Sequence, residues 1–200
     1  MTRFLLVRHA ATDAIGKWLS GRANGVHLND AGRIQAQELA QQLSALKLAA
    51  VYTSPLDRAI ETAAPIASLQ QVNAIEDEAF NEMDFGSWTN LPFEVLNELP
   101  AFRLFNSVRS LTRIPGGEMM AEAQARFIAG MQKLTSTYIG KTIAIVSHAD
   151  LIRSVILFYA GIPLDLFHRI EISTASVSTI ELYAETARIT GVNYKGKLII

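Results

Sequence analysis

The sequence of 200 residues contains no cysteine, which excludes disulfide bonds and thiolate metal sites. It also lacks an excess of charge of one sign, because 18 lysine and arginine residues stand against 19 aspartate and glutamate residues. The broad positive field that draws proteins to nucleic acid or to an anionic membrane is therefore missing. We expect no nucleic-acid partner and no membrane partner, and any bound anion must be held by a local cluster of side chains.

Long apolar runs are missing as well. The first apolar stretch, Phe4 to Val7, stops at Arg8 and is far too short for the core of a signal peptide or for a membrane span. The longest later stretch, Leu151 to Ile162, contains Arg153 and is also too short. We therefore expect a soluble, cytoplasmic protein.

What is present is the composition of a folded domain. Half of the residues are hydrophobic and 18% are charged, which is far from the composition of disordered chains. The chain shows no internal repeat, low-complexity tract or linker, and its length allows one substantial core. We predict a single domain over residues 1–200.

Short apolar or β-branched runs predict four strands, and longer helical patterns lie between them. The strands are expected at Phe4 to Val7, Ala50 to Thr53, Thr142 to Val146 and Val177 to Tyr183. The helices are expected at Asp30 to Leu46, at Pro55 to Ser68, from about Glu118 onward, and at Ala149 to Ala160. This alternation predicts an α/β fold: a three-layer αβα sandwich with a mostly parallel, doubly wound central sheet.

Residues 85–115 do not follow this alternation. Aromatic and basic side chains occur here in irregular order, at Trp88, Phe93, Phe102, Arg103, Phe105, Arg109 and Arg113. We interpret the segment as a small cap-like insertion that covers a site. The alternative is an ordinary helical connection whose arginines are solvated.

Basic side chains and histidines follow three of the predicted strands, at the edge where ligands bind in open α/β sheets. The first strand runs into Arg8 and His9, the second leads to Arg58, and the third leads to His148. Arg58 falls in the first turn of its helix, where free N–H groups and the helix dipole favour an anion. Taken alone, it could equally be a surface arginine paired with Glu61. Two histidines and two arginines at one edge predict a phosphate site.

Four segments carry a resemblance to a known family. In chain order they are Leu5-Leu6-Val7-Arg8-His9-Ala10, Ser54-Pro55-Leu56-Asp57-Arg58-Ala59, Asn81-Glu82-Met83-Asp84-Phe85-Gly86-Ser87-Trp88 and Val146-Ser147-His148-Ala149-Asp150-Leu151-Ile152-Arg153. With these segments, the chain resembles the histidine phosphatase superfamily, or phosphoglycerate mutase-like family, from residue 4 to about residue 183. It departs from the family pattern at Ala10, Ala149 and Asp150, where glycines are usual.

The resemblance implies a role for each matching residue. His9 is expected to attack phosphorus through one unprotonated ring nitrogen, while its other nitrogen donates to a fixed acceptor such as a backbone carbonyl. Arg8, Arg58 and His148 are expected to surround the transferring phosphoryl group, and Glu82 to donate a proton to the leaving group. Further substrate or phosphate contacts are expected at Thr12, Ser20, Gly21, Arg22 and Ala149.

The function predicted in this way is hydrolysis of a small phosphorylated metabolite through a phosphohistidine at His9, with no cofactor and no metal. A phosphoglycerate mutase-type reaction is the alternative, and a non-catalytic phosphoester-binding module is a weaker one. A metal hydrolase with His9, His148 and Glu82 as ligands is disfavoured, because two arginines beside these ligands would repel a cation. The partner is therefore a small phosphate monoester, and a homodimer is left open.

Overall fold

The structure is a computed structural model that describes residues 1–196. Six strands form one sheet in the order β3-β2-β4-β1-β5-β6. They are β1 (Thr2–Arg8), β2 (Leu48–Thr53), β3 (Ala74–Glu76), β4 (Thr142–Ser147), β5 (Val177–Leu182) and β6 (Ala187–Tyr194). The pairs β1 with β4, β4 with β2, and β2 with β3 are parallel, whereas β5 pairs antiparallel with β1 and with β6. The sheet is thus mixed, with a parallel part that ends at β1.

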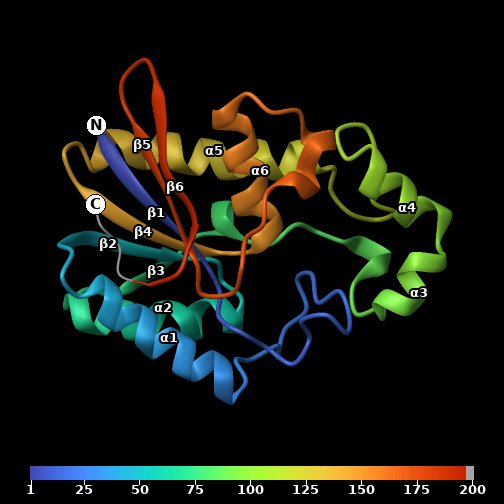
Figure 1. The fold of residues 1–200 in the computed structure, drawn as a ribbon, viewed down its shortest axis with the longest axis horizontal. Coiled ribbons are helices and arrows are strands. Elements are labelled where there is room, and N and C mark those ends of the chain that lie inside the picture. Colours follow the sequence, from blue (N-terminus) through green and yellow to red (C-terminus); the bar gives the residue numbers. More distant parts are fainter. Residues whose placement is uncertain (197–200) are drawn as a thin grey trace.

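Helices cover both faces of this sheet (Figure 1). One face carries α1 (Asp30–Leu43) and α2 (Asp57–Gln70), and the other carries α5 (Met120–Thr137) and α6 (Ala149–Ala160). The short helices α3 (Phe93–Glu98) and α4 (Pro100–Ser107) lie beyond the end of the sheet, at the right of Figure 1. The predicted α/β class and αβα layers are confirmed.

The central strand β1 shows why its sequence is a continuous apolar run. Leu5 and Val7 belong to the apolar cluster under α1 and α2, whereas Phe4 and Leu6 belong to the cluster under α5 and α6. All four side chains are fully buried. A strand covered on both faces needs apolar residues at every position, so no alternation appears.

Local hydrogen bonds shift the helix ends relative to the predictions. The Asn29 side chain caps α1 by accepting from the Gly32 amide, as its position suggests. The helix predicted from Pro55 begins instead at Asp57, because Leu56 is extended. The helix expected from Glu118 begins at Met120, because the Glu118 amide donates to the Asp84 carbonyl in a turn.

Candidate active site

The carboxyl ends of β1 and β4 face a cavity of about 410 Å³. These two strands are parallel neighbours in matched register, and the His9 amide donates to the Ser147 carbonyl at 2.9 Å. The residues that follow the strands, His9 and His148, therefore lie side by side, with ring centroids 5.3 Å apart. The sheet topology alone accounts for the meeting of the two imidazoles.

The His9 ring is buried and held in one tautomer. Its Nδ1 atom lies 2.8 Å from the carbonyl oxygen of Ala10, which can only accept, so Nδ1 carries the proton and Nε2 keeps its lone pair. Burial and the positive charges of Arg58 and Arg8 lower the pKa of His9 well below its ordinary value. At neutral pH the ring is therefore uncharged and has one unprotonated nitrogen.

His148 is fully buried behind Arg58. Its Nδ1 atom lies 3.3 Å from Nη2 of Arg58, which can only donate, and its Nε2 atom lies 2.8 Å from the Ser54 hydroxyl oxygen. Burial, followed by the charge of Arg58, lowers the pKa of His148 well below its ordinary value. The ring is thus neutral, and its Nε2 proton points to Ser54.

Two guanidinium groups beside the histidines have unused hydrogen-bond donors. Arg58 is only 1% exposed, and its Nη2 donates to the Gly21 carbonyl at 2.7 Å. Within the described part of the chain, Nε and Nη1 of Arg58 and Nε of Arg8 are buried with no hydrogen-bond partner. Unsatisfied buried donors are costly, and acceptor oxygens of an anion would satisfy them. Both arginines line the cavity, which can therefore hold a phosphate group.

Glu82 lines the same cavity, and its Oε2 atom lies 3.6 Å from Nδ1 of His148. Burial and the negative charge of Asp150 raise the pKa of Glu82 to about 7, against the opposing effect of Arg58. A carboxyl group with this pKa holds a proton for much of the time near pH 7. It can both donate and accept a proton there.

The loop that carries Glu82 is fixed by a guanidinium group from α5, a contact that the sequence analysis missed. Arg126 donates to the carbonyl oxygens of Glu78, Ala79 and Asn81 at 2.9 to 3.0 Å. Its Nη2 atom also donates to the Glu82 carbonyl at 3.3 Å. No pattern around Arg126 distinguishes it from an ordinary surface arginine of a helix, because the four carbonyl groups that it contacts lie more than 40 residues away in the chain.

Three of the five further substrate contacts expected from the sequence line the cavity, namely Ser20, Gly21 and Ala149. The other two do not, among the residues that the structure describes. The Thr12 side chain is buried elsewhere. The Arg22 guanidinium donates to the Glu82 carbonyl at 2.8 Å and pairs with the Glu118 carboxylate at 3.0 Å, so it supports the Glu82 loop from outside.

The outer wall of the cavity comes mainly from residues 14–21 and from the segment 85–109. Arg109 is the one arginine of this segment that lines the cavity, within the described residues. Arg103 donates to the Asn97 carbonyl, and Arg113 pairs with Glu122, both at exposed positions. The wall contains the aromatic side chains of Trp18, Phe85, Phe93, Phe102 and Phe105.

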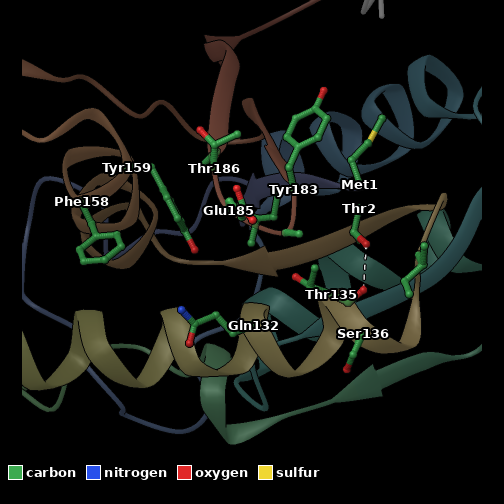
Figure 2. A pocket seen from close by; sticks show the side chains of 14 residues that line it. Met1, Thr2, Gln132, Thr135, Ser136, Phe158, Tyr159, Tyr183, Glu185 and Thr186 are labelled. Atoms are coloured by element: carbon green, nitrogen blue, oxygen red, sulfur yellow. Dashed lines mark hydrogen bonds between the residues drawn. The ribbon is translucent and has the colours of Figure 1, made fainter.

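A second cavity, of about 740 Å³, lies at the amino end of β1 (Figure 2). It is lined by the ends of α5 and α6 and by the turn between β5 and β6, with Gln132, Tyr159 and Glu185 among its polar residues. Its lining contains no lysine, arginine or histidine side chain among the described residues. It therefore lacks the cations that a phosphate requires, and the smaller cavity is the candidate active site.

Residues 1–196 contain neither a metal-binding group of side chains nor a helix that could cross a membrane. No three histidine, cysteine, aspartate or glutamate side chains lie close enough together in this range to hold a metal ion. His9, His148 and Glu82 thus do not form such a group. None of the helices in the same range has the length and apolar character needed to cross a membrane.

Comparison with known proteins places this site in a family. Residues 4–195 match the histidine phosphatase superfamily, branch 1. The chain is 30% identical to phosphoserine phosphatase 1 of Hydrogenobacter thermophilus, over 91% of this chain and 87% of that relative. This chain belongs to the histidine phosphatase superfamily. The family and this relative indicate a phosphatase or a mutase.

Two solved structures have the same fold as this chain. YhfR of Bacillus stearothermophilus superposes with a TM-score of 0.91 at 26% identity, over 98% of this chain and 99% of that one. A phosphoserine phosphatase mutant of Entamoeba histolytica, in complex with phosphoserine, gives a TM-score of 0.88 at 27% identity over the whole of both chains.

This histidine phosphatase accommodates alanine at position 10 without backbone strain. The described residues with positive φ do not include Ala10. Its amide donates to the Thr62 hydroxyl at 2.9 Å, and its side chain packs with Leu28 and Ala36. The additional methyl group is therefore buried in an apolar contact that a glycine would not make.

Proposed function

We propose that this histidine phosphatase is a phosphoric monoester hydrolase that acts on a small phosphorylated metabolite through a phosphohistidine at His9. The observation that carries the proposal is the juxtaposition of the free Nε2 lone pair of His9 with the unpartnered buried donors of Arg58 and Arg8. A phosphate monoester supplies both an electrophilic phosphorus atom and the acceptor oxygens that these donors lack.

The first step forms a bond from His9 Nε2 to phosphorus and breaks the bond from phosphorus to the ester oxygen. The electron pair of the broken bond leaves with that oxygen, which takes a proton from Glu82. The Nδ1–H group of His9 keeps donating to the Ala10 carbonyl, so the ring holds its orientation while it gains positive charge.

In the second step, Glu82 takes a proton from water, and the oxygen of that water attacks phosphorus. The bond from phosphorus to Nε2 breaks, its electron pair returns to the ring, and inorganic phosphate leaves. Arg8 and Arg58 stabilise the charge on the phosphoryl oxygens in both steps, and His148 contributes by positioning Arg58.

The segment 85–115 serves in this proposal as a cap. Its aromatic side chains surround the leaving group, whereas the phosphate binds against the sheet edge. Ser20, Gly21 and Ala149 are assigned to substrate contact because they line the cavity. Arg22 is assigned to supporting the Glu82 loop from outside, and Thr12 is given no substrate contact.

Rapid-quench labelling with a radioactive phosphate monoester tests the proposal. We expect an acid-labile, alkali-stable adduct on His9 during turnover, and neither adduct nor phosphate release with His9→Ala. Turnover without any such adduct would overturn the mechanism. Isomerisation of a phosphoglycerate at a rate above phosphate release would identify the mutase-type reaction instead.

A further inference from the structure

Asp150 occupies an unusual position in the candidate active site. It lies in the first turn of α6, directly after Ala149, and lines the cavity. Its Oδ2 atom accepts from Nη1 of Arg109 at 3.2 Å, and its Oδ1 atom accepts from Nη1 of Arg153 at 3.4 Å. One carboxylate thus holds both of the guanidinium groups of the outer wall.

The two arginines have further contacts on their other sides, although Nε of each is buried without a hydrogen-bond partner in the described part of the chain. The Arg109 guanidinium lies 3.8 Å from the Phe167 ring centroid and 4.4 Å from that of Phe105. Its Nη2 atom donates to the Asn106 side chain at 2.7 Å. Arg153 stacks on Phe167 as well, at 4.5 Å. Neither guanidinium group can turn to a ligand without losing these contacts.

The exposed fraction of its side chain distinguishes Asp150 from the two arginines. The Asp150 side chain is 23% exposed, against 5% for Arg109 and 12% for Arg153. Each carboxylate oxygen has two lone pairs, and one hydrogen bond to each leaves an acceptor site on both. The Asp150 carboxylate can therefore accept a hydrogen bond from the substrate in the outer part of the cavity, although it is also paired with Arg109 and Arg153.

We propose that Asp150 is a specificity-determining residue, whose carboxylate accepts a hydrogen bond from a hydroxyl or ammonium group of the leaving alcohol. By holding Arg109 and Arg153, it also keeps the cavity from accepting a second anionic group at this place. The inference rests on the proposed phosphatase function, and it adds the class of leaving group: an alcohol with a further hydrogen-bond donor and no further anion near Asp150.

The test uses four phosphate esters whose leaving groups share a three-carbon chain: propyl, 3-hydroxypropyl, 3-aminopropyl and 2-carboxyethyl phosphate. Each is measured as a competitor of p-nitrophenyl phosphate, so that each gives a competition constant whatever its own turnover. We expect the hydroxypropyl and aminopropyl esters to compete roughly tenfold better than the other two, as a hydrogen bond to a charged group allows. Equal competition by all four esters, or preference for the carboxyethyl ester, would overturn the inference.

Asp150→Asn keeps the size of the side chain and removes its charge. We expect the donor preference to fall roughly tenfold and competition by the carboxyethyl ester to improve. Asp30→Asn is the matched control, because Asp30 also lies in the first turn of a helix and pairs with an arginine three residues later, far from the cavity. An unchanged order of competitors in Asp150→Asn, or the same change in Asp30→Asn, would contradict the assignment.

The comparison separates this inference from the proposed function. Failure of the proposed function would appear as p-nitrophenyl phosphate hydrolysis that persists in His9→Ala. If only the Asp150 inference fails, the wild type shows no preference for the hydroxyl and amino esters, and hydrolysis still depends on His9. The wild-type measurements alone suffice if Asp150→Asn does not fold.

Discussion

At the scale of single residues, Arg58 combines a charge with almost complete burial. Its guanidinium contacts Gly21 and His148, and two of its nitrogen atoms have no partner in the described structure. Such donors stabilise the transition state of phosphoryl transfer more strongly than the ground state, because negative charge is spread over the phosphoryl oxygens in the transition state.

We predict that Arg58→Ala lowers kcat roughly a thousandfold. The measurement is steady-state phosphate release, with Arg33→Ala as control, because Arg33 pairs with exposed Asp30 on the surface of α1. A kcat within tenfold of the wild type would remove Arg58 from phosphoryl stabilisation.

Glu82 provides a pH signature, because its pKa is raised to about 7. If its proton goes to the leaving group, kcat/KM, which reports the first step, falls as pH rises through about 7. The pKa of the His9 ring is lowered, so no second loss is expected from ring protonation as pH falls from 7 to 6. We predict that Glu82→Gln removes the limb near pH 7 and lowers kcat roughly a hundredfold. The substrate's own second ionisation affects both proteins alike, so the difference between their profiles is the decisive quantity.

The same carboxyl group links stability to pH. Its pKa in the folded protein is raised from 4.5, so the folded state binds this proton more tightly than the unfolded state. The contribution of Glu82 to the free energy of unfolding is complete below about pH 4.5. It is lost as pH rises toward 7, by an amount on the order of 2 to 3 kcal/mol. Denaturation of wild type and Glu82→Gln between these pH values measures it, and equal pH dependence in both proteins would exclude a raised pKa.

Single residues differ in how far the sequence could predict them. His9, His148 and Arg58 follow strands whose apolar runs are unmistakable, so their convergence could be predicted. The Arg126 contacts and the pairing of Asp150 with Arg109 could not, because they join residues that are about 40 or more positions apart in the chain.

At the scale of elements, two turns packed back to back fix the start and end of the segment 85–115. The Ser87 amide donates to the Pro115 carbonyl, and the Glu118 amide donates to the Asp84 carbonyl. Gly86 has φ +46°, and a Cβ atom there would lie 2.3 Å from the Pro115 carbonyl oxygen. Only glycine allows so close an approach of the two turns.

We predict that Gly86→Ala destabilises the protein by about 3 kcal/mol or more, through both backbone strain and this clash. Gly116→Ala is the matched control: its φ is also positive, at +71°, but the nearest atom to an added Cβ lies 3.9 Å away. It is expected to cost about 1 kcal/mol. Equal costs in urea denaturation would show that strain alone, without the clash, determines the effect.

Elements with strong local patterns were predictable, and those defined by pairing were not. The predicted strands correspond to β1, β2, β4 and β5. β3 was missed because it has only three residues. β6 was missed because it pairs with β5 in a hairpin, and the turn between Tyr183 and Thr186 contains no glycine or asparagine to mark it. The two short helices α3 and α4 lie in the segment for which only a cap-like insertion was predicted.

At the scale of the whole molecule, the chain is nearly neutral, and the charges of Arg8 and Arg58 stand out beside His9. Positive charge is concentrated beside His9, where it would repel a metal cation. We predict that activity survives exhaustive dialysis against a chelator unchanged, and that added divalent ions do not raise it. Loss of activity that one particular metal restores would contradict the mechanism proposed for His9.

The anchoring of His9 also determines how the protein should lose its function under mild denaturation. The His9 amide is bonded to Ser147 at the end of two central strands, each of which has a neighbour on both sides. Its deuterium exchange should therefore require global opening, whereas helices α3 and α4 at the periphery open first. Warming or low denaturant would then weaken substrate affinity while the reacting centre stays assembled, so KM should rise before kcat declines.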